Sequence, residues 1–158
     1  MGRAIPLLIV AACAWTQALA QPAPEAPGVR TDKAPVRAQR FMAVTANPHA
    51  TDAAQAILAR GGSAVDAAIA AQLVLGLVEP QSSGIGGGAF MLVHDARRAR
   101  LHAYDGRETA PAAAKADRFL KPDGTPMAFR DAVATGIAVG VPGVVRMLGL
   151  AHAKHGRL

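Results

Sequence analysis

Cysteine is almost absent from this chain of 158 residues. The single cysteine, Cys13, lies near the N-terminus. Residues 1–20 have the form of an export signal, with Arg3 at the start, an apolar run over residues 5–15 and small residues suited to cleavage at 18–20. The mature protein would then hold no thiol, which excludes disulfide bonds and thiolate chemistry. We expect a periplasmic or secreted protein; lipoprotein processing at Cys13 is the alternative.

Aromatic residues are also scarce, at 4% of a chain that is 51% hydrophobic, so the interior must be built from Ala, Val, Leu and Ile. Residues 21–38 contain four prolines and almost no large apolar side chain, which predicts a disordered leader. No apolar run is long enough to span a membrane. The net charge of +6 comes from scattered residues rather than a basic cluster, so nucleic-acid binding has no support. The folded part is expected to be residues 39–158.

The folded part alternates between strand and helix patterns. In chain order we predict a strand at 41–45, a helix at 51–60, a helix from 64 that ends by 79–80, a hairpin of 89–94 and 101–105, a turn at 122–124, a strand at 137–141 and a final helix that starts near Pro142. This indicates an α/β (α+β) fold with about four strands.

Several residues should fix these helices. Thr51 is the expected N-cap of the first helix and Gly61–Gly62 its expected stop, and Ser63 should form a capping box with Asp66 at the start of the second. The second helix is apolar on nearly every side, which predicts that it is buried and needs cover on more than one face. In the last helix the residues expected on the buried side are Val144, Val145, Leu148 and Ala151.

Three candidate chemistries have weak support. The glycine-rich residues 84–89 follow a helix and open a strand, the reverse of a dinucleotide-binding loop, so we expect these glycines to supply positive φ angles and close packing. They could also aim N–H groups into a cavity. His152 and His155 have a spacing that metal ligands use, but the helix dipole explains them better, so no metal or cofactor is expected. The chain has no Gly-x-Ser-x-Gly elbow and no other equipped nucleophile.

Arg107 is the strongest candidate for a binding residue. It lies in residues 105–111 (DGRETAP), a turn just past an apolar strand, where its side chain can face inward. A guanidinium presents a planar set of donors that matches a carboxylate, and such a charge-assisted pair contributes roughly 1.5–3 kcal/mol. The pattern therefore predicts a carboxylate-binding arginine.

From about residue 40 onward the chain resembles a bacterial γ-glutamyltransferase (γ-glutamyltranspeptidase), of the N-terminal nucleophile hydrolase superfamily. The matching segments, in family order, are residues 42–44 (MAV), 57–68 (ILARGGSAVDAA), 80–92 (PQSSGIGGGAFML), 104–111 (YDGRETAP) and 140–143 (GVPG). The resemblance implies an αββα sandwich, incomplete in this chain, and an exported precursor that cuts itself into a large and a small subunit. Its partners would be the rest of its own precursor, γ-glutamyl compounds such as glutathione, and amino-acid acceptors.

The implied chemistry is acyl transfer without a cofactor. The small subunit begins with a threonine that attacks the γ-glutamyl amide and forms an ester, which water or an amino acid then cleaves. Arg107 would bind the α-carboxylate of the γ-glutamyl group. The chain ends before the family's cleavage point, so we expect an N-terminal fragment with no catalytic residue of its own and no activity. The alternatives are a related acylase of the glutaryl or cephalosporin type and a non-catalytic exported binding module.

Overall fold

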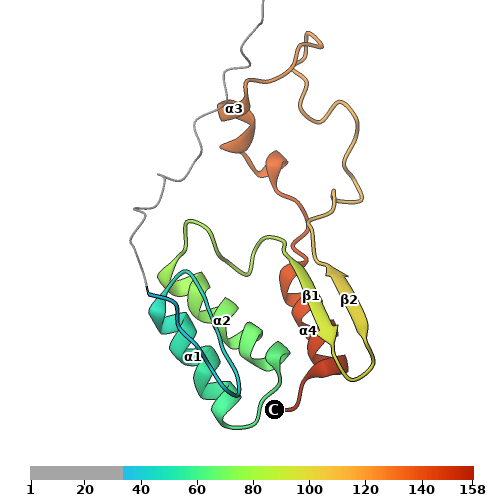
Figure 1. Ribbon diagram of the computed structural model, residues 1–158. Coiled ribbons are helices and arrows are strands. Elements are labelled where there is room, and N and C mark those ends of the chain that lie inside the picture. The colour runs from blue at the N-terminus through green and yellow to red at the C-terminus, as the bar shows by residue number, and fades with distance from the viewer. Residues whose placement is uncertain (1–33) are drawn as a thin grey trace, which may run out of the picture. The chain divides into compact units, whose positions relative to one another are not determined.

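The computed structural model describes residues 34–158 (Figure 1). The chain divides into Met1–Arg37 and Ala38–Leu158, and the second unit holds every helix and strand of the described part. The predicted export signal lies outside the described residues, as does most of the predicted leader. Between residues 34 and 158, no helix is both long and apolar enough to span a membrane.

Helix α1 (Pro48–Ala59) begins three residues before the predicted start, so the prediction of Thr51 as its N-cap was wrong. Asn47 is the cap: its side chain accepts a hydrogen bond from the backbone N–H of His49 at 3.0 Å, and Pro48 takes the first helical position, where no N–H is needed. Thr51 lies inside the helix instead, with its Oγ1 2.7 Å from that of Thr45.

The end of α1 is a Schellman motif, and the predicted stop at the Gly61–Gly62 pair is confirmed. Gly62 N–H donates to the carbonyl of Ile57 at 3.0 Å, and Gly61 N–H donates to that of Leu58 at 3.1 Å. Gly61 has a φ of +90°, the left-handed conformation that this motif requires and that glycine adopts without steric cost.

Helix α2 (Ala64–Val78) starts with the predicted capping box and ends where expected. Ser63 N–H donates to Asp66 Oδ2 at 2.7 Å, and Asp66 N–H donates to Ser63 Oγ at 3.1 Å. The two helices lie side by side (Figure 1) and share a core of small residues: Ala50, Ala54, Ala67 and Ala71. Alanines on both helices allow the close approach that a core without aromatics needs.

The expectation that α2 is buried on nearly every side does not hold for this chain. Val65 is buried, but Leu73 and Leu77 are 55% and 80% exposed. One face of α2 packs on α1 and another contacts α4, while nothing among residues 34–158 covers the face that carries Leu73 and Leu77.

The predicted hairpin is confirmed as β1 (Phe90–Asp95) and β2 (Arg100–Asp105), an antiparallel pair whose register runs from Phe90 opposite Asp105 to Asp95 opposite Arg100. The other two predicted strands were wrong. Among residues 34–158, no strand pairs with residues 41–45. In the same range, residues 137–141 begin in the 3-10 turn η1 (Gly136–Ala138) and form only an isolated bridge, between Val141 and Thr109. The described sheet therefore has two strands rather than about four.

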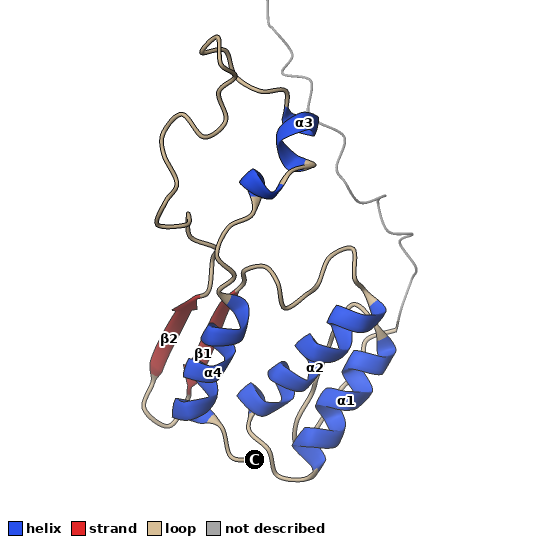
Figure 2. Ribbon diagram, turned by 180° about the vertical axis from the view of Figure 1, so that it is seen from behind, coloured by secondary structure: helices blue, strands red, loops and turns tan. Residues whose placement is uncertain are grey.

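Helix α4 (Val144–His155) lies along the hairpin (Figure 2). Val144, Met147 and Leu148 form its buried side and pack against residues that include Met91 and Tyr104. Val145 was predicted on this side but is 57% exposed. Between hairpin and helix, the chain runs through irregular segments, the predicted turn with Gly124 at φ +80° and the short helix α3 (Phe129–Val133).

Asp66 links the start of α2 to the segment after α4. Besides the capping contact, its Oδ2 accepts a hydrogen bond from Arg157 N–H at 2.9 Å, and His152 Nε2 lies 3.3 Å from its Oδ1. Burial alone raises the pKa of Asp66, but these hydrogen bonds and the charge of His152 outweigh burial and hold its pKa below the ordinary value of 3.8. The charged form is thus the one that the fold stabilises.

We expect Asp66→Ala to destabilise the complete protein by about 1–3 kcal/mol at neutral pH, because it removes the charged acceptor of two part-buried hydrogen bonds, those from the N–H groups of Ser63 and Arg157. A carboxyl group with a lowered pKa contributes fully above its unfolded value and loses that contribution as pH falls through its folded value. The difference in melting temperature between wild type and Asp66→Ala should therefore shrink below pH 3.8. Asp52→Ala, at an exposed position of α1, is the control. A difference that does not change with pH would contradict this account.

Candidate functional site

Arg107 directly follows the hairpin, and the backbone there is tightly held. Gly106 extends the pairing of the two strands: its N–H donates to the Ala89 carbonyl at 2.9 Å, and Ala89 N–H donates back at 3.3 Å. Arg107 N–H then donates to Asp105 Oδ1 at 2.8 Å, which closes a turn of the Asx type. The predicted turn after an apolar strand is therefore present, and it fixes where the Arg107 side chain leaves the backbone.

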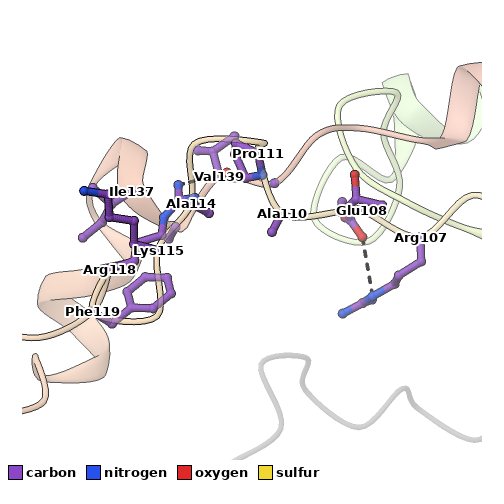
Figure 3. A pocket seen from close by; sticks show the side chains of 13 residues that line it. Arg107, Glu108, Ala110, Pro111, Ala114, Lys115, Arg118, Phe119, Ile137 and Val139 are labelled. Carbon is purple, nitrogen blue, oxygen red and sulfur yellow. Dashed lines mark hydrogen bonds and ion pairs between the residues drawn. The ribbon is translucent and has the colours of Figure 1, made fainter.

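The sequence predicted that the Arg107 side chain can face inward, but in the structure it does not. It is 72% exposed, and its one ionic partner among residues 34–158 is Glu108, with Nε 3.6 Å from Oε2 (Figure 3). That contact engages only Nε. In the described part of the chain no group pairs with the two terminal nitrogens, which form the edge that receives a carboxylate in a bidentate pair.

Glu108 was not predicted from the sequence as a site residue. Its Oε2 is buried and accepts no hydrogen bond from the residues described, so its ion pair with Arg107 is its main compensation. Glycines make room for it: a Cβ on Gly88 would lie 2.5 Å from Oε2, and one on Gly140 would lie 2.9 Å from the Cβ of Glu108. The signal was available, because an acid directly after the key arginine is a candidate partner for it.

The glycine-rich segment provides close packing, as predicted, but not the predicted positive φ angles. In residues 34–158 the only glycines with positive φ are Gly61 and Gly124. Within the run, the carbonyl of Gly87 accepts hydrogen bonds from the N–H groups of Gly143 and Val144, at 3.1 and 3.2 Å. The run therefore holds the first turn of α4 against the residues around Arg107.

A cleft of about 470 Å³ begins at Arg107 (Figure 3). Its walls come from two segments, residues 107–119 and residues 137–140. Three cationic side chains line it, those of Arg107, Lys115 and Arg118, against one carboxylate, that of Glu108. Figure 3 shows Arg107 at one end and Arg118 beside Phe119 at the other. The cleft is positively charged overall, so it suits an anionic ligand.

The two histidines of α4 have separate partners. His155 Nε2 lies 2.9 Å from the hydroxyl of Tyr104, which ties α4 to the hairpin. His152 Nε2 lies 2.9 Å from the carbonyl of Leu158 and close to Asp66. Within residues 34–158 no group of three His, Cys, Asp or Glu side chains is arranged to hold a metal ion.

Residues 50–158 match the sequence profile of the family described as gamma-glutamyltranspeptidase. The chain belongs to this family. It is 44% identical over 115 residues to the glutathione hydrolase proenzyme of Bacillus subtilis (strain 168), covering 73% of this chain and 20% of that protein. With the glutathione hydrolase proenzyme of Escherichia coli (strain K12) it shares 38% over 157 residues, which is 98% of this chain and 27% of the relative.

The similarity extends to solved structures. The crystal structure of Helicobacter pylori gamma-glutamyltranspeptidase aligns with a TM-score of 0.73 at 33% identity, over 78% of this chain and 35% of that one. The fold prediction is thereby confirmed: the chain has part of the γ-glutamyltranspeptidase fold, of the N-terminal nucleophile hydrolase class. It spans 20–27% of the length of the two curated relatives named above.

Proposed function

We propose that the complete protein is a γ-glutamyltransferase that cleaves the γ-glutamyl amide of glutathione or a similar compound and transfers the γ-glutamyl group to water or an amino acid. The observation that carries this proposal is the arginine of the family motif, Arg107, whose terminal nitrogens are open at the mouth of a positively charged cleft. The names of the curated relatives, glutathione hydrolase proenzymes, support the same substrate class.

In this proposal the present chain binds and orients the donor. Arg107 donates to the α-carboxylate from its two terminal nitrogens, while Glu108 keeps the guanidinium in place through Nε. The nucleophile is a threonine outside residues 1–158. Its hydroxyl attacks the γ-carbonyl, its free amine takes the proton and passes it to the departing amine, and an ester forms. Water or the amine of an acceptor then attacks the ester and restores the hydroxyl. No cofactor enters these steps.

We further propose that the protein is made as an exported precursor and divides into two subunits. The export signal at residues 1–20 supports a periplasmic or secreted location, with lipoprotein processing at Cys13 as the alternative. The exposed apolar face of α2, with Leu73 and Leu77, supports a packing partner from the rest of the precursor.

The test is to express the complete protein and measure its self-cleavage on a denaturing gel and its release of glutamate from glutathione. We expect two subunits and glutamate release. Hydrolysis of a glutaryl anilide in preference to a γ-glutamyl anilide would instead identify an acylase. A single uncut chain that binds ligands without cleaving them would identify a binding module and overturn the proposal.

A further inference from the structure

The end of the cleft away from Arg107 carries positive charge that the binding of one α-carboxylate does not use. Lys115 and Arg118 both line this part. Glu108, the one carboxylate that lines the cleft, pairs with Arg107 instead. Neither Lys115 nor Arg118 forms an ion pair with any carboxylate within the described range. Two cations that line one cleft without an acidic partner favour an anionic ligand.

The Arg118 side chain is held in position rather than free in solvent. Its Nη2 donates to the carbonyl of Val139 at 3.4 Å, and its guanidinium lies 5.9 Å from the centre of the Phe119 ring. The backbone N–H of Arg118 donates to the Lys115 carbonyl at 3.2 Å, so one turn carries both cations. An arginine that is fixed before a ligand arrives loses less conformational freedom when it binds an anion.

The size of the cleft agrees with a ligand that is longer than the γ-glutamyl group. Its volume of about 470 Å³ lies within the usual range for small-molecule sites. Figure 3 places the two charged regions at opposite ends, with the apolar side chains of Ala110, Pro111 and Ala114 between them. A molecule with two anionic groups joined by a less polar middle fits this arrangement.

We propose that Lys115 and Arg118 form a second carboxylate subsite, which binds the carboxylate on the far side of the scissile amide. This inference rests on the proposed function and narrows its substrate class. The preferred substrates carry a carboxylate beyond the γ-glutamyl group, either on the leaving group of the donor, as in glutathione, or on the amino acid that accepts the acyl group. Both sources present the same chemistry to the two cations, and the kinetics below separate them.

The test uses the complete protein with Lys115→Gln, Arg118→Gln and the double variant. The donors are glutathione and a γ-glutamyl anilide whose leaving group is uncharged; the acceptors are an amino acid and its amide. If the donor supplies the carboxylate, the double variant raises the KM for glutathione about ten-fold and that for the anilide less than about two-fold. If the acceptor supplies it, the KM for the amino acid rises by a similar factor and that for its amide does not.

Two control variants distinguish a loss of ligand binding from a general change in charge and from a folding defect. Lys121→Gln removes an exposed cation that does not line the cleft and should change none of these constants. Arg118→Lys keeps the charge but not the planar guanidinium, so it should restore part of the affinity that Arg118→Gln loses. If Arg118→Gln fails to self-cleave, exposed Lys115→Gln and the salt dependence of the wild type still decide, because added salt should weaken glutathione or amino-acid binding more than that of the uncharged analogues.

Equal changes for charged and uncharged substrates, or no change with either, would overturn the subsite while the wild type still cleaves both donors. A wild type that cleaves neither donor would overturn the proposed function, and the subsite with it.

Discussion

Arg107→Ala in the complete protein should raise the KM for glutathione at least about ten-fold, the equivalent of about 1.5–3 kcal/mol of lost charge-assisted binding. The geometry gives the reason: Glu108 engages only Nε, so the two terminal nitrogens are open to a carboxylate. Arg107→Lys should recover only part of this loss, because an ammonium group is a point charge and cannot form two parallel bonds to one carboxylate. Steady-state hydrolysis of glutathione is the measurement.

Arg98→Ala provides the matched control. Arg98 lies in the turn between β1 and β2, is exposed, and pairs with Asp95 at 3.1 Å, so its loss should not alter the KM. Both variants should still divide into two subunits, because neither side chain supports the core. Unchanged kinetics in Arg107→Ala would remove this residue from the binding site.

The features that the sequence predicted correctly depend on neighbours in the chain. The capping box of Ser63 and Asp66, the glycine stop after α1 and the hairpin each involve residues within a short stretch, where one local pattern dominates. The wrong N-cap was a local competition as well. Asn47 followed by Pro48 is a stronger start signal than Thr51, because asparagine caps at least as well and proline suits the first helical position.

The wrong predictions of strands and of buried helix faces depend on partners that are distant in the sequence. An apolar run such as 137–141 becomes a strand only if another strand accepts its backbone hydrogen bonds, and here Thr109 offers a single bridge. In the same way, periodicity places Leu73, Leu77 and Val145 on apolar helix faces, but it does not show whether another element covers those faces. The faces of a helix are assigned by packing against residues that are distant in the sequence, and periodicity does not identify those residues.

The candidate site divides along the same line. The turn at Arg107 could be predicted because its residues are contiguous in the sequence, and the binding role of Arg107 stays a prediction. Lys115 and Arg118 lie in a poorly patterned stretch, and they line a cleft only because residues 137–140 return to form its other wall. Periodicity along the sequence does not predict that residues 137–140 lie beside residues 107–119.

Gly106→Ala should give the largest combined effect on stability and activity. Gly106 is buried, and a Cβ there would lie 2.7 Å from the Cβ of Met147 and 3.1 Å from the carbonyl oxygen of Gly143. Because these atoms belong to the backbone and the base of a side chain, relief requires α4 to move away from the hairpin. Overpacking of this kind costs about 1–3 kcal/mol. Since Arg107 is the next residue, a displacement of about 1 Å should also lower kcat/KM roughly 100-fold.

Gly149→Ala separates the effect of space from the effect of losing a glycine. Gly149 lies inside α4, and a Cβ there would meet no atom within 4 Å. In a helix interior, alanine is more favourable than glycine by about 0.5–1 kcal/mol. This variant should therefore be slightly more stable than wild type and fully active. Relative to wild type, the melting temperature should therefore fall for Gly106→Ala and rise slightly for Gly149→Ala. Glutathione hydrolysis should fall sharply for Gly106→Ala and stay unchanged for Gly149→Ala. If the two glycines respond alike, the close contact of α4 with the arginine turn does not set the geometry of the site.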